Sequence, residues 1–219
     1  MSFAPQLSAL PDAQRALWPQ LKALSQRFVL YGGTALALRY GHRISEDFDF
    51  FCDAPMSADG LLDTLPFLKG AVVRQKALNT LTVSVRMPKP VKVSFFGLSL
   101  RRVKNPERTD DGVMRVASAL DIAGCKMAAV QSRSESKDYV DVAELLKNGI
   151  ALADALGAAQ AIYGEQFHPM ITLKALTYFE DGDLPLLPES IKQSLCAATV
   201  IEDISHFEAL PGGLVPAET

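Results

Sequence analysis

Two aspartates two positions apart, Asp47 and Asp49, are the residues of this chain whose types and spacing most directly suggest chemistry. They alternate with Phe48 and Phe50, and side chains at i and i+2 of a β-strand point to the same side. The two carboxylates are therefore expected to lie together while the phenylalanines enter a core. Mg²⁺ prefers such oxygen ligands, usually one or two carboxylates completed by substrate phosphates. We predict a Mg²⁺ site at Asp47 and Asp49.

A glycine pair, Gly32 and Gly33, follows a short β-prone run and precedes an apolar helical segment. Glycines at a strand-to-helix turn let the backbone approach a bound group closely, and a helix start offers unpaired N–H groups to phosphate. Thr34 adds a hydroxyl there. Beside a carboxylate pair, this arrangement suits magnesium-dependent phosphoryl or nucleotidyl transfer. Each feature alone has a plainer interpretation, since Asp-x-Asp is commonly a solvated strand face and Gly-Gly a simple turn.

The second half of the chain contains charged residues within helical patterns. Lys126 stands in an otherwise apolar helical face, where a charge is costly unless it reaches water or an anion. The residues alone leave both options open. Asp138 and Asp141 share one helix face, and Lys137 is spaced to pair with Asp141. From spacing alone, these three residues indicate a solvated, salt-bridged helix start.

Residues 31–51 resemble the AbiEii/AbiGii-type toxin family of the nucleotidyltransferase superfamily. That family joins a Gly-Gly-Thr/Ser-Ala-Leu-Ala-Leu start to a His-Arg-x-Ser-x-Asp-x-Asp-Phe-Phe end. The matching positions are Gly32, Gly33, Thr34 through Leu38, His42, Arg43, Ser45, Asp47, Asp49, Phe50 and Phe51. Residues 120–142 resemble the family's Lys-bearing helix and following Lys-Asp-x-x-Asp run, with matches at Lys126, Lys137, Asp138 and Asp141.

The resemblance implies magnesium-dependent transfer of a nucleoside monophosphate from an NTP to a hydroxyl acceptor, typically tRNA, by a toxin that acts beside an antitoxin. It implies catalytic roles for Asp47, Asp49, Lys126, and one of Asp138 and Asp141. It implies nucleotide binding by Gly32, Gly33, Thr34, Arg43, Ser45 and Lys137. The residues alone leave Arg43 three options, which are to hold a phosphate, to orient Asp47 or to pair with Glu46.

One position departs from the family pattern. A later strand often carries a third carboxylate in a Val-Lys-Val-Asp-Phe-Phe-like run, whereas this chain has Ser94 there. Two rival functions therefore remain beside the transferase. One is a nucleotide-binding or regulatory protein with impaired catalysis, and the other is a nucleotidyltransferase that modifies a small molecule such as an antibiotic.

Composition sets the protein class. The chain has 219 residues, 48% hydrophobic and 21% charged, which suits a globular protein with a real core. The net charge of −3 gives no overall basic field, although a local patch can serve RNA. Three scattered cysteines favour reduced thiols in the cytoplasm over disulfides or zinc. The chain shows no Walker-type loop, Rossmann glycine set or Gly-x-Ser-x-Gly elbow, and no apolar run long enough to span a membrane.

The periodicity of apolar residues predicts the elements that position these groups. Strands are expected over 28–31, 47–51, 71–77, 81–87 and 91–96. Helices are expected over 12–26, 35–40, 57–65, 118–133, 136–146, 151–163, 169–179 and 188–209. The polar run 104–112 is predicted to be a loop and a domain boundary. We predict an α+β fold with a nucleotidyltransferase-like mixed sheet and flanking helices in a core domain over 1–112, followed by a helical C-terminal domain over 113–219.

Overall fold

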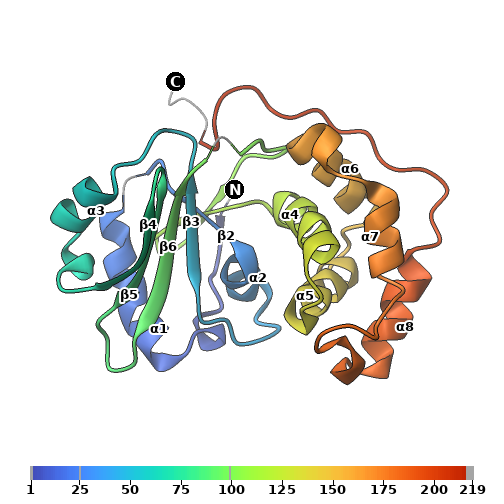
Figure 1. The fold of residues 1–219 in the computed structure, drawn as a ribbon, viewed down its shortest axis with the longest axis horizontal. Helices are drawn as coiled ribbons and strands as arrows, with labels where there is room; N and C mark the ends of the chain where they lie inside the picture. The colour runs from blue at the N-terminus through green and yellow to red at the C-terminus, as the bar shows by residue number, and fades with distance from the viewer. Residues whose placement is uncertain (1, 25, 99, 216–219) are drawn as a thin grey trace. The chain divides into compact units, whose positions relative to one another are not determined.

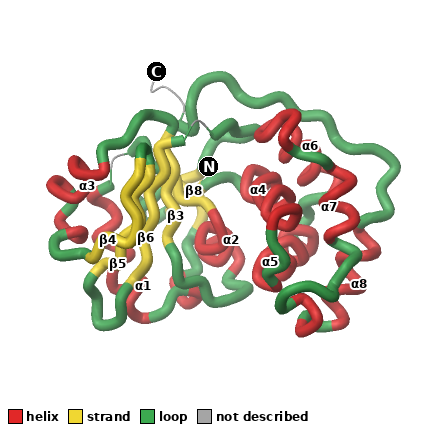
Figure 2. Tube along the Cα trace, viewed as in Figure 1, coloured by secondary structure: helices red, strands yellow, loops and turns green. Residues whose placement is uncertain are grey.

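The computed structural model describes residues 2–24, 26–98 and 100–215, which form two compact units (Figure 1). The first unit takes in Met1–Leu100, Asn105–Ser118 and Pro211–Thr219, and the second takes in Arg101–Lys104 and Ala119–Leu210. The strands all belong to the first unit, and the second is helical (Figure 2). The predicted α+β class with a helical C-terminal part is confirmed.

The described residues of the first unit build a mixed sheet of eight strands in the order β1-β7-β8-β2-β3-β6-β5-β4. The strands are β1 Ser2–Phe3, β2 Val29–Tyr31, β3 Phe48–Cys52, β4 Val72–Ala77, β5 Thr80–Val85, β6 Val91–Gly97, β7 Glu107–Thr109 and β8 Arg115–Val116. Strand β3 lies antiparallel to β2 and parallel to β6. Strands β1, β7 and β8 were not predicted, because they have only two or three residues and, unlike β2, do not lie in a run of apolar β-prone residues. Strand β7 lies within the expected loop 104–112.

The helices of the first unit follow the sequence signals at most ends. They are α1 Asp12–Leu17, α2 Gly32–Tyr40 and α3 Ala58–Thr64, with 3-10 turns η1 Leu7–Ala9, η2 Trp18–Ala23 and η3 Pro66–Leu68. The expected helix 12–26 changes to 3-10 geometry after Leu17, because Pro19 lacks the N–H that would continue it. Helix α2 ends at Gly41 in the left-handed region, and the Ser57 hydroxyl caps α3 by accepting from the N–H of Gly60 at 3.1 Å.

Alternation along β3 separates its two faces, as predicted. Phe48 and Phe50 are fully buried. The Phe48 ring stacks on Trp18, with centroids 6.3 Å apart, and the Phe50 ring stacks on Phe95 at 5.5 Å. This side of β3 is therefore the helix-packed face of the sheet. Asp49 alternates with the two phenylalanines, so its carboxylate lies on the opposite face.

The second unit is a helical assembly around α4. Its helices are α4 Ala119–Ser132, α5 Ser136–Lys147, α6 Leu152–Tyr163, α7 Pro169–Ala175 and α8 Glu189–Ala198, with 3-10 turns η4 Gly164–Gln166 and η5 Leu184–Leu186. Helix α4 packs against α5, α6 and α7 (Figure 1). Its approach to α6 is close, because a Cβ on Gly124 would lie 3.0 Å from the backbone nitrogen of Ala159. Among the described residues, none of the helices is long and apolar enough to cross a bilayer.

One detail of the second unit differs from the sequence expectation. The expected helix 188–209 ends at Ala198, and the following segment packs on α6 instead, where the N–H of Ser205 bonds the carbonyl of Ala153. Only glycine fits at position 157 beneath it, since a Cβ would overlap the carbonyl oxygen of Ser205. Asp121, in the first turn of α4, accepts from the N–H groups of Val103 and Lys104 at 2.7 and 3.1 Å.

Candidate active site

The carboxylates of Asp47 and Asp49 belong to the start of β3. Asp47 directly precedes the strand with its side chain 43% exposed, and Asp49 is half-buried within it. Tyr31, the last residue of β2, pairs in register with Asp49. Because β2 leads directly into α2, this pairing sets the glycine turn beside the carboxylate. The glycine turn and the carboxylate of Asp49 thus lie next to each other, as the sequence suggested.

Gly32 is required at this turn for two reasons. Its φ of +75° lies in the left-handed region, which residues with a Cβ rarely adopt. A Cβ at this position would also lie only 3.1 Å from Oδ2 of Asp49. The absence of a side chain thus leaves the Asp49 carboxylate next to the backbone that begins α2, where the first N–H groups of the helix lack intrahelical partners.

The hydroxyls of Thr34 and Ser45 are buried and lie 2.7 Å apart. The Thr34 hydroxyl also donates to the backbone carbonyl of Asp47. A threonine hydroxyl has one proton, so Ser45 must be the donor between the two hydroxyls. The pair anchors the backbone that carries Asp47. Their predicted contact with nucleotide stays a prediction.

Arg43 lies in the turn before Asp47, and its guanidinium donates to the carbonyl of Ile44 at 3.0 Å. This bond is a local backbone contact. It does not choose among the three roles that the sequence left open, and phosphate binding by Arg43 stays a prediction.

Ser94 is the in-register neighbour of Asp49 on β6. Its side chain is buried, and its hydroxyl lies 3.4 Å from that of Thr82 on β5. A carboxylate at position 94 would therefore stand directly beside Asp49 on the same face of the sheet. The chain has a neutral hydroxyl at this position instead.

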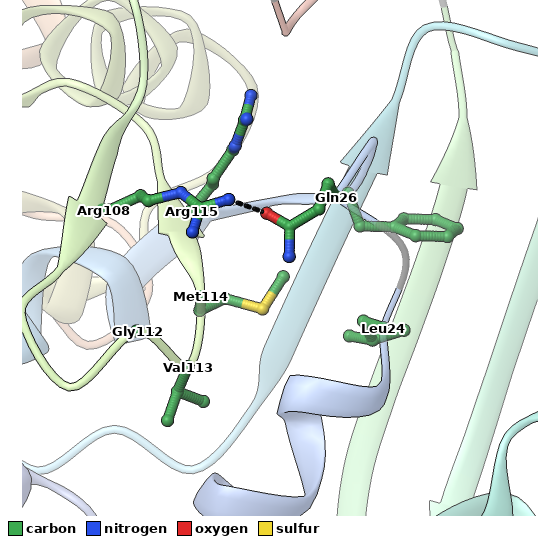
Figure 3. A pocket seen from close by; sticks show the side chains of 8 residues that line it. Leu24, Gln26, Arg108, Gly112, Val113, Met114 and Arg115 are labelled. Atoms are coloured by element: carbon green, nitrogen blue, oxygen red, sulfur yellow. Dashed lines mark hydrogen bonds between the residues drawn. The ribbon is translucent and has the colours of Figure 1, made fainter.

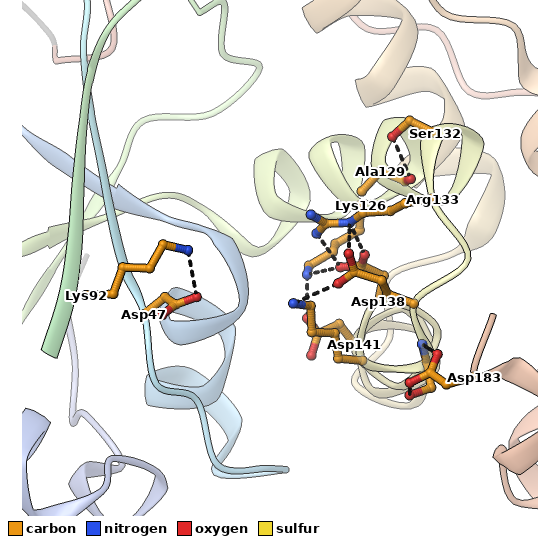
Figure 4. Close-up of polar contacts among 12 residues, drawn as sticks. Asp47, Lys92, Lys126, Ala129, Ser132, Arg133, Asp138, Asp141 and Asp183 are labelled. Carbon is orange, nitrogen blue, oxygen red and sulfur yellow. Dashed lines mark hydrogen bonds and ion pairs between the residues drawn. The ribbon is translucent and has the colours of Figure 1, made fainter. Parts of the chain in front are cut away.

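Lys92 is a residue of this site that sequence reasoning missed. Its ammonium lies 3.2 Å from Oδ2 of Asp47, and both side chains are about half exposed (Figure 4). The signal was present in the sequence, since Lys92 stands two residues before Ser94 and so shares its face of β6. Lys92 places a positive charge against a predicted metal ligand.

The second unit brings Lys126, Asp138 and Asp141 together in a buried cluster. The Lys126 ammonium lies 2.7 Å from Asp138 and 2.5 Å from Asp141, and neither carboxylate is exposed (Figure 4). Arg133 adds two bonds to Asp138, at 2.6 and 3.1 Å. Lys126 therefore neither extends into water nor stands as an uncompensated charge. Arg133 also lies 3.8 Å from Glu135, so it links the buried carboxylates to an acid at the surface.

Burial and charge act in opposite directions on Asp138. Loss of water raises the pKa of its carboxyl, but the bonds from Arg133 and the nearby Lys126 charge outweigh this effect, so the pKa lies below its usual value. The carboxylate is ionised at neutral pH. Lys137, expected from its spacing to pair with Asp141, forms its ion pair with Glu135 at 2.7 Å instead.

The predicted site residues thus fall into two sets, each within its own unit. One set gathers at β3, the α2 turn and β6, and it comprises Gly32, Gly33, Thr34, Arg43, Ser45, Asp47 and Asp49. The other lies on α4 and α5, and it comprises Lys126, Lys137, Asp138 and Asp141. Across the described part of the chain, no three His, Cys, Asp or Glu side chains converge as metal ligands. Asp47 and Asp49 supply the hard oxygens that suit Mg²⁺, which takes its remaining ligands from phosphates and water.

A mixed sheet with a glycine turn beside the carboxylates at the start of β3, followed by helices, defines a nucleotidyltransferase-like protein. The sequence profile described as "Nucleotidyl transferase AbiEii toxin, Type IV TA system" matches residues 15–203. The chain belongs to this family of nucleotidyltransferase toxins.

Comparison with other proteins gives one sequence relative and two solved structures of similar fold. The uncharacterized protein aq_aa25 of Aquifex aeolicus (strain VF5) is 33% identical over 158 residues, which cover 71% of this chain and 75% of that protein. The fold resembles MenT4, a nucleotidyltransferase toxin of Mycobacterium tuberculosis H37Rv, with a TM-score of 0.57, 15% identity, and coverage of 84% of this chain and 79% of that chain. A putative nucleotidyltransferase from H. pylori gives a TM-score of 0.50 at 19% identity, covering 85% of this chain and 90% of that chain.

Replacing Lys126 with Met should destabilise the protein, because it removes the ammonium that lies between two buried carboxylates. Breaking a buried ion pair from one side costs about 3–5 kcal/mol. The double variant K126M/D141N also removes one of the buried negative charges and should recover part of the loss. Denaturant unfolding of both variants measures the free energy of unfolding. Equal stability of K126M and wild type would show that the Lys126 ion pairs do not stabilise the fold.

The low pKa of Asp138 predicts a pH-dependent contribution to stability. Because the folded pKa lies below the unfolded value of about 3.9, this contribution is complete above that value and is lost as the pH falls through the folded pKa. Arg133→Gln removes a cause of the shift. The difference in unfolding free energy between wild type and R133Q should therefore be constant near neutral pH and shrink in acid. A difference that grows in acid would contradict this assignment.

Lys92 should compete with a divalent cation for Asp47. Lys92→Met removes a charge that opposes the metal and an ion pair that the metal must displace, so Mn²⁺, used as a probe for Mg²⁺, should bind about two- to tenfold more tightly. Electron paramagnetic resonance of free Mn²⁺ measures this affinity. Lys76→Met is the matched control, since Lys76 forms an exposed ion pair with Asp59 at 2.6 Å. Unchanged or weaker Mn²⁺ binding by K92M would refute the competition.

Proposed function

We propose that this protein transfers a nucleoside monophosphate from an NTP to a hydroxyl acceptor, with Asp47 and Asp49 holding Mg²⁺. The observation that carries the proposal is the placement of these carboxylates beside the Gly32 turn, in a chain of the AbiEii family. Bound Mg²⁺ would neutralise charge on the triphosphate. The residues present fit that ion, because both acids offer oxygen ligands and Asp47 is partly exposed.

In the proposed reaction, the acceptor oxygen attacks the α-phosphorus of the NTP. A new oxygen–phosphorus bond forms, the bond to the bridging oxygen breaks, and pyrophosphate leaves. The backbone at Gly32 and Gly33 binds the triphosphate at the start of α2, and Arg43 adds a positive charge. Thr34 and Ser45 hold the Asp47 backbone, so we assign them positioning roles beside any contact with nucleotide.

The family resemblance also leads us to propose that Lys126, Asp138 and Asp141 take part in transfer, with Lys137 as a further nucleotide contact. Lys126 is balanced by two carboxylates, so a phosphate oxygen that bound its ammonium would displace one of them. A carboxylate released in this way can accept the proton of the attacking hydroxyl. General-base assistance of this kind contributes about 10²–10⁴ in rate.

For the acceptor we propose RNA, and tRNA in particular, and we propose a cognate antitoxin as the regulatory partner. The support for the RNA acceptor is the family resemblance of residues 31–51 and 120–142, and the support for the antitoxin is the type IV toxin–antitoxin description of the family. The four NTPs, each labelled on the α-phosphate, should be incubated with the protein, Mg²⁺ and total RNA. Label in the tRNA fraction with one NTP is the expected result, and absence of labelled RNA with every NTP would refute the RNA acceptor.

Ser94 favours a second candidate function. A neutral hydroxyl stands beside Asp49 where a third carboxylate would complete the site, so a protein that binds NTP but transfers slowly is the alternative. The two functions differ in one measurement. An NTP-binding protein with impaired transfer would bind NTP and Mg²⁺ without labelling any acceptor in the same assay.

Asp47→Asn and Asp49→Asn should each lower the transfer rate by about 10²-fold or more, because each removes a charged ligand of the proposed metal. Mn²⁺ affinity should fall in parallel, while far-UV circular dichroism should stay unchanged. Asp59→Asn serves as the control, since Asp59 is an exposed acid paired with Lys76. Transfer at the wild-type rate in both site variants would exclude the proposed metal ligands.

Ser94→Asp tests whether the chain lacks a base. If Asp138 or Asp141 already accepts the proton, S94D should change the rate little, whereas D138N or D141N should abolish transfer. We expect this result. Since both acids are buried with Lys126, thermal melting of the Asn variants must first show that they remain folded. A large gain in rate for S94D, together with full activity in both Asn variants, would show that the site lacks a third carboxylate and that neither acid replaces it.

A further inference from the structure

One part of the first unit is rich in basic residues and contains no acid. Although the whole chain has a net charge of −3, the sequence has no aspartate or glutamate between positions 65 and 92. The same stretch contains the basic residues Lys69, Arg74, Lys76, Arg86, Lys89 and Lys92. It forms the neighbouring strands β4, β5 and β6 and the turns between them (Figure 1). This end of the strand order therefore carries local positive charge.

Three of these basic side chains are exposed and unpaired. Lys69 precedes β4, and Arg86 and Lys89 lie in the turn between β5 and β6. Within residues 2–24, 26–98 and 100–215, none of the three forms a hydrogen bond or an ion pair. Because no acid neutralises them, their positive charges can attract an anion from solution.

Other basic residues of the first unit already have partners. Arg108 donates to the side-chain oxygen of Gln26, beside a pocket of about 10 Å³ that has room for about one water molecule (Figure 3). Arg39 pairs with Glu107 at 2.7 Å. A phosphate that bound either arginine would compete with these contacts, whereas the three unpaired residues would bind it without such competition.

The register of the sheet places the three residues at the end that carries Asp47. Strands β3 and β6 are parallel, so both begin at this end. Strand β5 is antiparallel to β6 and finishes at Val85, opposite Val91. Strand β4 is antiparallel to β5 and begins near Val72, opposite Ser84. The turn after β5 and the residues before β4 therefore lie at the same end of the sheet as the start of β3.

Arg86 lies beside Lys69 and continues the face of the candidate site. A Cβ on Gly70, the residue after Lys69, would lie 3.9 Å from Nη1 of Arg86. Arg86 directly follows β5 and is two residues from Ser84, which pairs in register with Lys92. Since side chains alternate along a strand, Arg86 continues the face of Lys92, whose ammonium contacts the candidate site.

We propose that Lys69, Arg86 and Lys89 bind backbone phosphates of the RNA acceptor while its reacting hydroxyl lies at the candidate site. This inference rests on the proposed function. Three strand spacings, about 14 Å, separate β3 from β4. A stacked nucleic-acid strand carries roughly one phosphate per 3.4 Å, as in B-DNA, so an acceptor over this distance presents several phosphates. Phosphate contacts of this kind position RNA without reading its sequence.

An acidic protein segment is the other class of partner that positive charge would suit. Strand β4 lies at the edge of the sheet, where an extended segment could pair with its backbone. Lys69, Arg86 and Lys89 lie in the connections outside β4 and β5, beyond the ladder that such a segment would form. Their place at the end of the sheet that carries Asp47 favours the RNA acceptor.

The test uses the full-length protein and the triple variant K69Q/R86Q/K89Q. Its affinity for fluorescently labelled total tRNA, measured by anisotropy over a series of salt concentrations, should fall about tenfold or more at low salt. The slope of the logarithm of affinity against that of salt concentration should become shallower by about 2, since each lost phosphate contact contributes about 0.7–0.9. In the transfer assay, KM for RNA should rise while kcat changes little.

The triple variant R15Q/K22Q/K76Q is the matched control, because it removes the same charge elsewhere in the first unit. Arg15 and Lys22 lie on α1 and η2, and Lys76 forms an exposed ion pair with Asp59 of α3. The control should lose much less tRNA affinity than K69Q/R86Q/K89Q. An equal loss in both variants would show that only net charge matters and would overturn the inference.

Further measurements exclude other roles for the three residues. Binding of inorganic tripolyphosphate with Mn²⁺ should be equal in K69Q/R86Q/K89Q and wild type. If tRNA binding is unchanged, weaker binding of tripolyphosphate would assign the residues to the nucleotide, and weaker binding of poly-L-glutamate would assign them to an acidic protein. Either result would overturn the inference. If the triple variant melts at a lower temperature than wild type, the three single variants replace it, and an unchanged salt slope in all three would overturn the inference.

The outcome for wild type separates this inference from the proposed function. If wild-type protein neither binds nor labels RNA, the RNA acceptor itself is wrong and both proposals fall. If wild type binds and labels tRNA but K69Q/R86Q/K89Q does so with the same affinity and KM, only the assignment of these three residues is wrong.

Discussion

The central constraint in the first unit is the pairing of β3 between β2 and β6. Side chains along this strand point alternately to the two faces of the sheet. A shift of the register by one residue would therefore move every side chain to the opposite face. Phe48 and Phe50 fill the core against Trp18 and Phe95, so burial of these rings fixes the register. The same register holds Asp49 beside the end of β2 and beside Ser94. Core packing on one face thus determines the geometry of the polar groups on the other.

The turn after β2 depends on this pairing as well. Tyr31 is the register partner of Asp49, so the first residue after β2 meets the Asp49 side chain. Only glycine combines the left-handed backbone with the space that the carboxylate takes up. Behind this turn, the Thr34 and Ser45 hydroxyls bond to each other and to the Asp47 carbonyl. The two ends of the motif, 13 residues apart, are thereby tied together inside the core.

The main electrostatic feature of the second unit is its buried charged cluster. Burial of Lys126 and two aspartates without partners would cost a large desolvation free energy. The ion pairs of Lys126 with both aspartates and of Arg133 with Asp138 offset that cost. Removing Lys126 or either aspartate leaves a buried charge without a partner, so we expect the stability of this unit to depend on all three residues.

The sequence alone determined the strand alternation at Phe48 and Phe50, the stop of α2 at Gly41, the α+β class and the family. These features depend on local periodicity, glycine conformation and a run of matching residues, all of which are present in the linear chain. Only the tertiary structure decided the partners. In the fold, Lys92 forms an ion pair with Asp47, and Lys126 forms ion pairs with both buried aspartates. Ser94 pairs in register with Asp49, and the short strands β7 and β8 pair with each other. Each of these depends on pairing between distant segments, and side-chain spacing along one segment cannot specify which charge from another segment will lie opposite.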